Sequence, residues 1–272
     1  MKELLLQKLE GIGSRDERYN FTREYLQELV LQIIDRGGYF KCLAFVGGTA
    51  LRILYDMPRF SEDLDFSLIK KKGFSFEALL KTIKKELELN GFSVEEIKGK
   101  DKTVLSEFIR FKGLLYDLGL SRQKSEKLFI KLEIDSDPPK GFETELALVN
   151  RNFLFKVRSY KLPSLFASKL HAVLFRKYEK GRDYYDLLWF LTKNIPINYG
   201  LLSNAASQTG GEDVKLGPER TKDLLLAKIK RADFSHILSD VRPFLEEHKE
   251  TEYFKREHFM SAVERYFNKV EY

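Results

Sequence analysis

Apolar and polar positions follow two different periods along this chain. Where apolar residues recur at every third or fourth position we predict a helix, and where they alternate or form a short apolar run we predict a strand. In the first 160 residues this predicts helices over 21–38, 49–57 and 74–91, and strands over 39–46, 62–69, 92–98, 103–113, 127–135 and 153–160. Helices interleaved with strands indicate a mixed α/β domain, with 39–46 as a central strand.

From Pro163 onward the period is that of helices. Two helices are predicted over 164–180 and 184–194, divided by Gly181, and two more helical stretches over 222–247, with a break near Asp233, and 255–270. The turn-rich stretch 135–143 predicts a linker, and the polar stretch 198–220 predicts a loop containing a frayed helix. We therefore expect an α/β (α+β) protein with a mixed-sheet domain over 1–160 and a helical domain over 161–272.

The composition is that of a globular protein in a reducing compartment. With 272 residues, 43% of them hydrophobic, the chain can bury a sizeable core. Cys42 is the only cysteine, so no intrachain disulfide forms, and we predict that it is a small core residue. The sequence predicts neither a signal peptide nor a membrane span, so we expect a cytoplasmic protein without a membrane partner.

The positive charge is concentrated in one segment. The formal net charge is +6, and residues 151–193 alone hold ten Lys and Arg against three Asp and Glu. A basic segment of this kind suggests a polyanionic partner such as a nucleotide or RNA. Solvated helix faces would give the same composition, so charge alone does not decide between the two interpretations.

Two aspartates, Asp63 and Asp65, lie one residue apart in the predicted strand 62–69. Successive side chains in a strand point to opposite faces, so both carboxylates share one face while Leu64 and Phe66 point into the core. Carboxylates this close repel each other unless a cation lies between them. Mg²⁺ (or Mn²⁺) suits that role, because it is bound by one or two carboxylates together with substrate phosphates.

A glycine pair precedes these aspartates at a predicted strand-to-helix turn. Backbone N–H groups at Gly47 and Gly48 would let a phosphate approach the helix N-terminus, and the Thr49 hydroxyl would add a donor. An ordinary tight turn would also use glycines, and a solvated strand face would also carry aspartates. Both features together, in this order and about a dozen residues apart, instead predict in-line nucleotidyl transfer from an NTP.

The predicted strand 127–135 offers a third carboxylate. Glu133 and Asp135 share one face of this strand with Lys131, whereas Ile130, Leu132 and Ile134 occupy the other. We choose Glu133 as the third acid of the metal site and as the base that deprotonates the attacking hydroxyl. Asp135 lies nearer the linker and is the alternative.

Two helical segments carry further polar residues. Lys169, Ala172 and Arg176 fall on one predicted helical face, and Asp183 and Asp186 share a face of the next helix. Two amphipathic helices with their charged sides in water would give the same pattern. His171 is interpreted as an ordinary, partly buried histidine, because the four histidines show no metal-ligand spacing.

These motifs together resemble those of a known family. The sequence is similar to the AbiEii/AbiGii-type toxins, which include the MenT-like toxins and are minimal nucleotidyltransferases of the DNA-polymerase-β-like superfamily. They occur in bacterial abortive-infection and toxin–antitoxin systems. The resemblance covers most of the chain and rests on GGTALRILY, RFSEDLDF, KLEI, SKLHAVLFR, GRDYYDLLWF and DFSHILSDVRPFL.

The resemblance implies roles for individual residues. Gly47, Gly48 and Thr49 would hold the triphosphate, with Ser61 of RFSEDLDF added to this nucleotide-binding set, and Asp63 and Asp65 would hold Mg²⁺. Lys169 would contact the nucleotide phosphates. Asp183 would be the functional acid of the last catalytic motif, with Asp186 supporting it. The DFSHILSDVRPFL motif carries no obvious chemistry.

We therefore expect an NTP-dependent nucleotidyltransferase toxin that modifies RNA. Some related toxins add nucleotides to tRNA 3′ ends, which makes tRNA the expected acceptor, and a separately encoded antitoxin that need not bind the toxin is the expected partner. The basic segment supplies the candidate RNA-binding residues: Arg158, Lys161, Arg176, Lys177 and Lys180. The alternatives are transfer to a protein side chain or a small molecule, and a non-catalytic nucleotide- or RNA-binding module.

Overall fold

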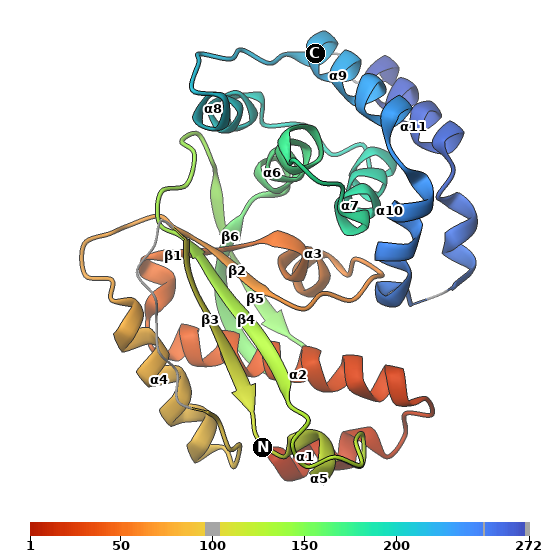
Figure 1. Ribbon diagram of the computed structural model, residues 1–272. Helices are drawn as coiled ribbons and strands as arrows, with labels where there is room; N and C mark the ends of the chain where they lie inside the picture. The colour runs from red at the N-terminus through yellow and green to blue at the C-terminus, as the bar shows by residue number, and fades with distance from the viewer. Residues whose placement is uncertain (96–103, 247, 270–272) are drawn as a thin grey trace. The chain divides into compact units, whose positions relative to one another are not determined.

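A computed structural model describes residues 1–95, 104–246 and 248–269 (Figure 1). The chain forms two compact units. The first contains Met1–Tyr55, Ser61–Pro138 and Glu145–Ser159. The second contains the short segments Asp56–Phe60 and Pro139–Thr144 together with the chain from Tyr160 onward.

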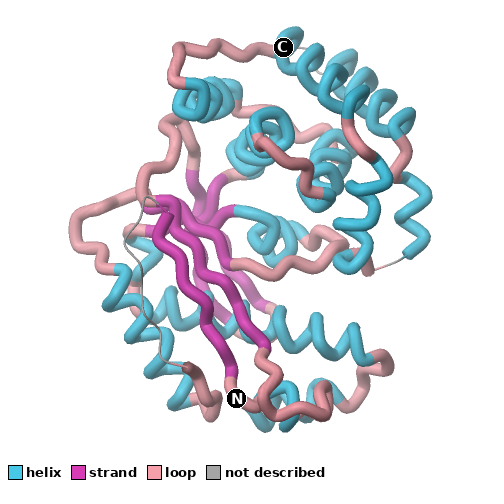
Figure 2. Tube along the Cα trace, in the orientation of Figure 1, coloured by secondary structure: helices cyan, strands magenta, loops and turns pink. Residues whose placement is uncertain are grey.

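The first unit is built on one six-stranded mixed sheet, drawn in magenta in Figure 2. The strand order is β3-β4-β2-β1-β6-β5; β1 is antiparallel to β2 and parallel to β6, while β4 is parallel to β2 and antiparallel to β3. The strands are β1 (Leu43–Val46), β2 (Leu64–Leu68), β3 (Val104–Phe111), β4 (Leu128–Asp135), β5 (Thr144–Asn150) and β6 (Leu154–Tyr160). Its helical elements are α1 (Lys2–Leu9), α2 (Arg15–Arg36), η1 (Tyr39–Lys41), α3 (Gly47–Tyr55), α4 (Phe76–Leu89) and α5 (Leu114–Asp117).

The core of this unit lies on one face of the sheet. Leu64 and Phe66 of β2 are buried, as are the alternate residues Ile130, Leu132 and Ile134 of β4, because residues two apart in a strand point the same way. The long helix α2 packs against β4 and against α4 (Figure 1). Its start is fixed by a capping box, in which Ser14 accepts from the Glu17 N–H and Glu17 accepts from the Ser14 N–H.

The predicted mixed α/β fold is confirmed, with three corrections. Only Leu43–Val46 of the predicted strand 39–46 is extended, and η1 precedes it. The predicted strand 92–98 lies partly outside the described residues, and its described part makes a single bridge from Val94 to Phe111. Strand β5 was not predicted, because Leu146 and Leu148 face outward and the segment shows no buried stripe.

The second unit is helical. Its elements are α6 (Leu162–Phe175), α7 (Gly181–Thr192), α8 (Tyr199–Gly210), α9 (Pro218–Arg231), α10 (Phe234–Val241), η2 (Arg242–Phe244), η3 (His248–Tyr253) and α11 (Arg256–Lys269). The predicted break near Asp233 is confirmed, since Asp233 caps α10 by accepting from the N–H groups of Ser235 and His236. The stretch 198–220, predicted as a loop containing a frayed helix, does contain a helix, but α8 is regular and is capped at its N-terminus by Asn198. Over the described residues, no helix combines the length and apolar character that crossing a membrane requires.

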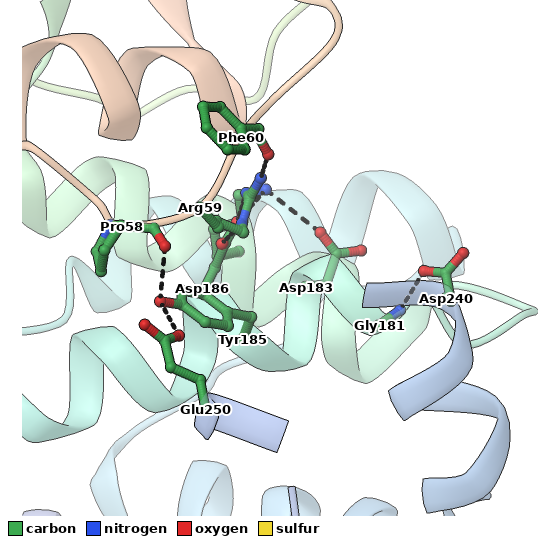
Figure 3. A network of polar contacts seen from close by, with 10 residues as sticks. Pro58, Arg59, Phe60, Gly181, Asp183, Tyr185, Asp186, Asp240 and Glu250 are labelled. Atoms are coloured by element: carbon green, nitrogen blue, oxygen red, sulfur yellow. Dashed lines mark hydrogen bonds and ion pairs between the residues drawn. The ribbon is translucent and has the colours of Figure 1, made fainter. Parts of the chain in front are cut away.

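Helix α10 packs directly onto the first residue of α7. A Cβ added to Gly181 would overlap the carbonyl oxygen of Ile237 and lie 2.9 Å from the N of Val241. The Gly181 N–H also donates to Oδ2 of Asp240, at 2.6 Å (Figure 3). A carboxylate is stabilising at a helix N-terminus, where unpaired N–H groups and the helix dipole favour negative charge. The DFSHILSDVRPFL motif thus holds the start of α7.

We expect Gly181→Ala to destabilise the helical unit by about 1–3 kcal/mol, the usual cost of overpacking. The methyl group would have to push the α10 backbone away and weaken the bond to Asp240. Trp189 is the only tryptophan and lies in α7, so urea unfolding followed by tryptophan fluorescence reports on this unit. Gly210→Ala is the matched control, because a Cβ at Gly210 meets no atom within 4 Å; equal stabilities of the two variants would contradict the packing argument.

Candidate functional site

The turn from β1 into α3 requires glycine at position 47. Gly47 has φ +80°, a conformation that residues with a Cβ rarely adopt. An added Cβ would also overlap the carboxylate of Asp65, which lies on the neighbouring strand opposite Val46. The first turn of α3 therefore lies directly against the Asp65 side chain.

Thr49 has a different role from the one its motif suggests. We expected its hydroxyl to donate to a phosphate, but the residue is fully buried and the hydroxyl donates to the main-chain carbonyl of Asp63. This bond ties α3 to the residue that precedes β2. Thr49 thus positions the aspartate segment. Ser61, also in this segment, is half-buried, and its carbonyl accepts from Nε2 of Gln27 at 3.1 Å.

Glu133 lies level with Asp65 on the same face of the sheet. Strands β2 and β4 run parallel, with Asp65 opposite Glu133 and Ser67 opposite Asp135. Asp63 is two residues before Asp65 and so shares its face, and all three carboxylates are half-buried. Asp135 lies one step further along, and its Oδ1 accepts from the Asp137 N–H at 2.9 Å, which is a turn-forming role. Burial raises the pKa of Asp135.

Lys131 places a positive charge among these carboxylates. Its Nζ lies 2.8 Å from Oε1 of Glu133. Burial alone would lower the pKa of Lys131, but the hydrogen bond and charge of Glu133 raise it above its ordinary value. The charges of Asp63 and Asp65 act in the same direction. Lys131 therefore offsets part of the repulsion among the three acids, a role that the sequence pattern did not predict.

The donor set suits a hard cation that takes its remaining ligands from a substrate. Among the residues that the structure describes, no three Asp, Glu, His or Cys side chains converge into a ready-made metal cage. Asp63 and Asp65 share a face, while Glu133 is held by Lys131. Mg²⁺ is commonly bound by one or two carboxylates together with substrate phosphates rather than by a complete protein cage. Two carboxylates beside a helix N-terminus fit that mode of binding.

The second unit contains a buried network of ionic groups (Figure 3). Arg59 donates to both carboxylate oxygens of Asp186, from Nε at 2.6 Å and from Nη2 at 2.7 Å. Lys169 of α6 lies 2.7 Å from Oδ2 of Asp186 and 3.3 Å from Oδ1 of Asp183. Arg176 also pairs with Asp183. Three cations thus share two carboxylates, so the network keeps a surplus of one positive charge.

Burial sets the electrostatics of this network. The side chains of Asp186 and Arg59 are 0% and 1% exposed, and that of Lys169 is 15% exposed. Burial tends to raise the pKa of Asp186, but Arg59 and Lys169 outweigh it and hold that pKa below its ordinary value. Burial likewise opposes the charge on Lys169, yet the two aspartates raise its pKa. Arg59, Lys169 and Asp186 are therefore charged at neutral pH.

Arg59 was not predicted as a site residue. It belongs to a five-residue segment, Asp56–Phe60, that packs with the helical unit. The Phe60 N–H donates to the carbonyl of Phe244 at 2.8 Å. The hydroxyl of Tyr185 bonds to the Pro58 carbonyl and, at 2.8 Å, to Glu250 (Figure 3). A single arginine in an irregular segment has no periodicity to mark it. Its position within RFSEDLDF was the only available signal.

The predicted RNA-binding residues are not equivalent. Helix α6 ends at Phe175, so Arg176 lies beyond it and not on the predicted helical face with Lys169. The Arg176 guanidinium forms an ion pair with Asp183. Lys161 pairs with Glu143 at 2.8 Å, and Arg158, in the first unit, donates to the Phe40 carbonyl at 3.1 Å. Lys177 is exposed.

Lys180 and His171 are both half-buried. Burial first, and the neighbouring charge of Arg182 second, lower the pKa of Lys180. His171 pairs with the hydroxyl of Thr209, as expected for an ordinary histidine. Cys42 is likewise half-buried and packs against the core.

Comparisons with known proteins identify a family and a fold that this chain shares. The family model described as "Nucleotidyl transferase AbiEii toxin, Type IV TA system" matches residues 29–266. The structure of JHP933 from Helicobacter pylori is similar over 92% of both chains, with a TM-score of 0.56 and 20% identity. A second H. pylori structure, described as a candidate nucleotidyltransferase, has the same TM-score and identity and covers 92% of this chain and 95% of its own.

A nucleotidyltransferase-like antigenic protein from Paracoccidioides brasiliensis is more distant. It shares 16% identity over 79% of this chain and 92% of its own, with a TM-score of 0.42. No curated protein sequence matches the chain. The two H. pylori structures, at 20% identity, establish the fold alone, and the family model establishes the family.

We expect Arg59→Leu to destabilise the helical unit by about 3–5 kcal/mol, because it leaves the buried Asp186 with one cation fewer. Urea unfolding followed by Trp189 fluorescence measures this loss. Lys71→Leu is the matched control, since its ion pair with Asp137 is 70% and 68% exposed and exposed pairs contribute little. A small effect of Arg59→Leu, equal to that of the control, would show that the Arg59–Asp186 pair does not hold this unit together.

Proposed function

Because the chain belongs to the AbiEii family of nucleotidyl transferase toxins from type IV toxin–antitoxin systems, we propose that it transfers a nucleoside monophosphate from an NTP to an RNA acceptor, the 3′ end of a tRNA, and thereby blocks growth. A separately encoded antitoxin would counteract it in the cytoplasm without having to form a complex with it.

The arrangement around Asp65 is the observation that carries this proposal. Its carboxylate lies against Gly47 at the N-terminus of α3 on one side and opposite Glu133 on the other. A helix N-terminus with glycines suits a phosphate, and paired carboxylates suit a divalent cation. The proximity of the Gly47 turn to these acids supports the proposal that the turn binds phosphate and the acids bind the metal.

Each group has a defined part in the reaction. The oxygen of the RNA hydroxyl attacks the α-phosphorus of the NTP, the bond from that phosphorus to the β-phosphate oxygen breaks, and pyrophosphate leaves. Glu133 would accept the hydroxyl proton, and the backbone at Gly47 and Gly48 would bind the triphosphate. Asp63 and Asp65, with Glu133, would hold Mg²⁺ or Mn²⁺, which neutralises charge on the transferred and leaving groups.

The proposal also gives a role to a lysine of the helical unit. Lys169 is charged and held by two carboxylates, so its ammonium has a fixed direction. We propose that it contacts the NTP phosphates, with Asp183 as the acid that orients it and Asp186 as the support for both. The surplus positive charge of this network favours a polyanionic ligand.

We expect Asp63→Asn or Asp65→Asn to lower the rate of transfer at least about 100-fold and to abolish growth inhibition, because each removes a carboxylate that would hold the Mg²⁺ that offsets the negative charge of the transition state. The measurement is incubation of the purified protein with each labelled NTP, Mg²⁺ and total RNA or total protein. Asp137→Asn, an exposed carboxylate near the end of β4, is the matched control and should keep full activity. Full activity of both site variants would show that these aspartates do not take part in the reaction and only form a solvated strand face.

The same assay distinguishes the two candidates for the third acid. Glu133→Gln should lower transfer strongly, whereas Asp135→Asn should leave most of it, because Asp135 is not level with Asp65. The reverse result would transfer the role to Asp135.

We expect reversal of Lys177 and Lys180 to Glu to lower RNA labelling while the apparent affinity for NTP stays unchanged. Each phosphate contact releases counterions, so three or four contacts give a log–log salt slope of roughly −2 to −4 for RNA binding. A double reversal on α9, Lys228→Glu with Lys230→Glu, makes the same charge change elsewhere and serves as the control. Label that appears in protein would instead favour a protein acceptor. A transfer rate that changes neither with the two charge reversals nor with salt concentration would favour a small-molecule acceptor.

A further inference from the structure

A mostly apolar cavity lies within the helical unit. It has a volume of about 540 Å³ and is bounded by α7, the segment around η3, and α11. This volume falls within the range of sites that bind small ligands or single groups of a larger one. None of the residues that line it belongs to the Arg59–Asp186 network except Tyr185, whose hydroxyl bonds to Glu250 at one side of the cavity.

Aromatic side chains form the walls of this cavity. Trp189 is half-buried, Tyr253 is 61% exposed, and Phe254 is buried against Tyr185 with 6.1 Å between ring centroids. The small side chain of Ala262 on α11 leaves space opposite them. Tyr253 contributes a large ring to the surface without being needed in the core. Exposed rings around an open space are the groups on which nucleobases stack.

Two cations stand at the same cavity. Arg265 and Lys269 are four residues apart on α11, so they lie on one face of the helix, and both are exposed. Neither makes an ion pair with any other residue in the described part of the chain. The cavity therefore combines aromatic walls with cations that lack a described counter-charge. This combination complements a ligand that is both aromatic and anionic.

We infer that this cavity binds one nucleotide of single-stranded RNA, with the base against Trp189 and Tyr253 and the phosphate at Arg265 and Lys269. The inference rests on the proposed function in one respect, since the RNA would be the acceptor. Base stacking on aromatic side chains and phosphate binding by cations together recognise single strands without reading a sequence. The site would hold the acceptor at a point separate from the reacting hydroxyl.

The single tryptophan of the chain makes the inference directly measurable. A mixed-sequence pentaribonucleotide is titrated into the wild-type protein without NTP, so that no transfer occurs, while Trp189 fluorescence is recorded. We expect saturable quenching by the RNA and none by inorganic tripolyphosphate, which carries charge without bases. Equal quenching by tripolyphosphate, or none by RNA, would overturn the inference, and stronger quenching by hexaglutamate would assign the cavity to an acidic peptide.

Variants then locate the binding. Tyr253→Ala keeps the fluorescent probe and should raise the dissociation constant of the RNA about 5- to 150-fold, the range for loss of one stacking ring. Ala262→Leu, which narrows the cavity, should weaken binding as well. Tyr116→Ala removes a comparably exposed tyrosine, 50% exposed, from α5 and should change nothing. Unchanged binding in both cavity variants would overturn the inference.

The inference and the proposed function fail in different experiments. Quenching that depends on Tyr253, with no labelling of RNA by any NTP, would leave the cavity as an RNA site and refute the transfer reaction. In the opposite case, RNA is labelled, neither Tyr253→Ala nor Ala262→Leu changes the labelling rate, and RNA does not quench Trp189 fluorescence. That result would support the transfer reaction and refute RNA binding in the cavity.

Discussion

The carboxylate of Asp186 is the group on which the helical unit depends. It is fully buried and is bound by cations from two other segments, Arg59 between α3 and β2 and Lys169 on α6. Because an unpaired charge in a low-dielectric interior is very costly, these segments cannot separate from α7 without a large loss of stability. The bidentate geometry adds direction to this constraint, since the arginine fork matches the carboxylate only in one plane. Apolar packing around it tolerates small shifts, but the ion pair does not.

Two glycines, which have no Cβ, are as important for this structure as the charged side chains. At Gly47 the absence of a Cβ lets the start of α3 approach the Asp65 carboxylate, and at Gly181 it lets α10 approach the start of α7. In both places a helix N-terminus lies close to an aspartate, Asp65 in one case and Asp240 in the other. In the first pair, Asp65 is half-buried and sits on the carboxylate face of the sheet, which fits the ligand-binding role proposed for it. The second is used internally, since Asp240 accepts the Gly181 N–H.

The sequence predicts those features that depend on period and spacing. The shared face of Asp63 and Asp65 and the location of Glu133 on β4 follow from the strand period, and the parallel register that sets Glu133 level with Asp65 needed the structure. The period could not show that Thr49 bonds to the Asp63 carbonyl, because that contact joins residues fourteen positions apart. Arg59 was missed for the same reason, since its partner is 127 positions away. Helix α8 was predicted only as a frayed helix, because its serines and glycines are poor helix formers; tertiary packing of Leu201, Leu202 and Ala206 outweighs them.

The same residue type serves two purposes in this chain, and burial distinguishes them. Asp186 is fully buried, both of its carboxylate oxygens accept hydrogen bonds, and its partners keep it ionised. Its charge therefore stabilises the fold. Asp63 and Asp65 lie on a half-exposed face, where Lys131 offsets only part of the charge of three carboxylates. The proposed metal-binding role gives that remaining negative charge a use, because paired carboxylates attract a divalent cation. Under that proposal, removing Asp63 or Asp65 affects ligand binding more than stability, whereas removing a partner of the buried Asp186 affects the fold itself.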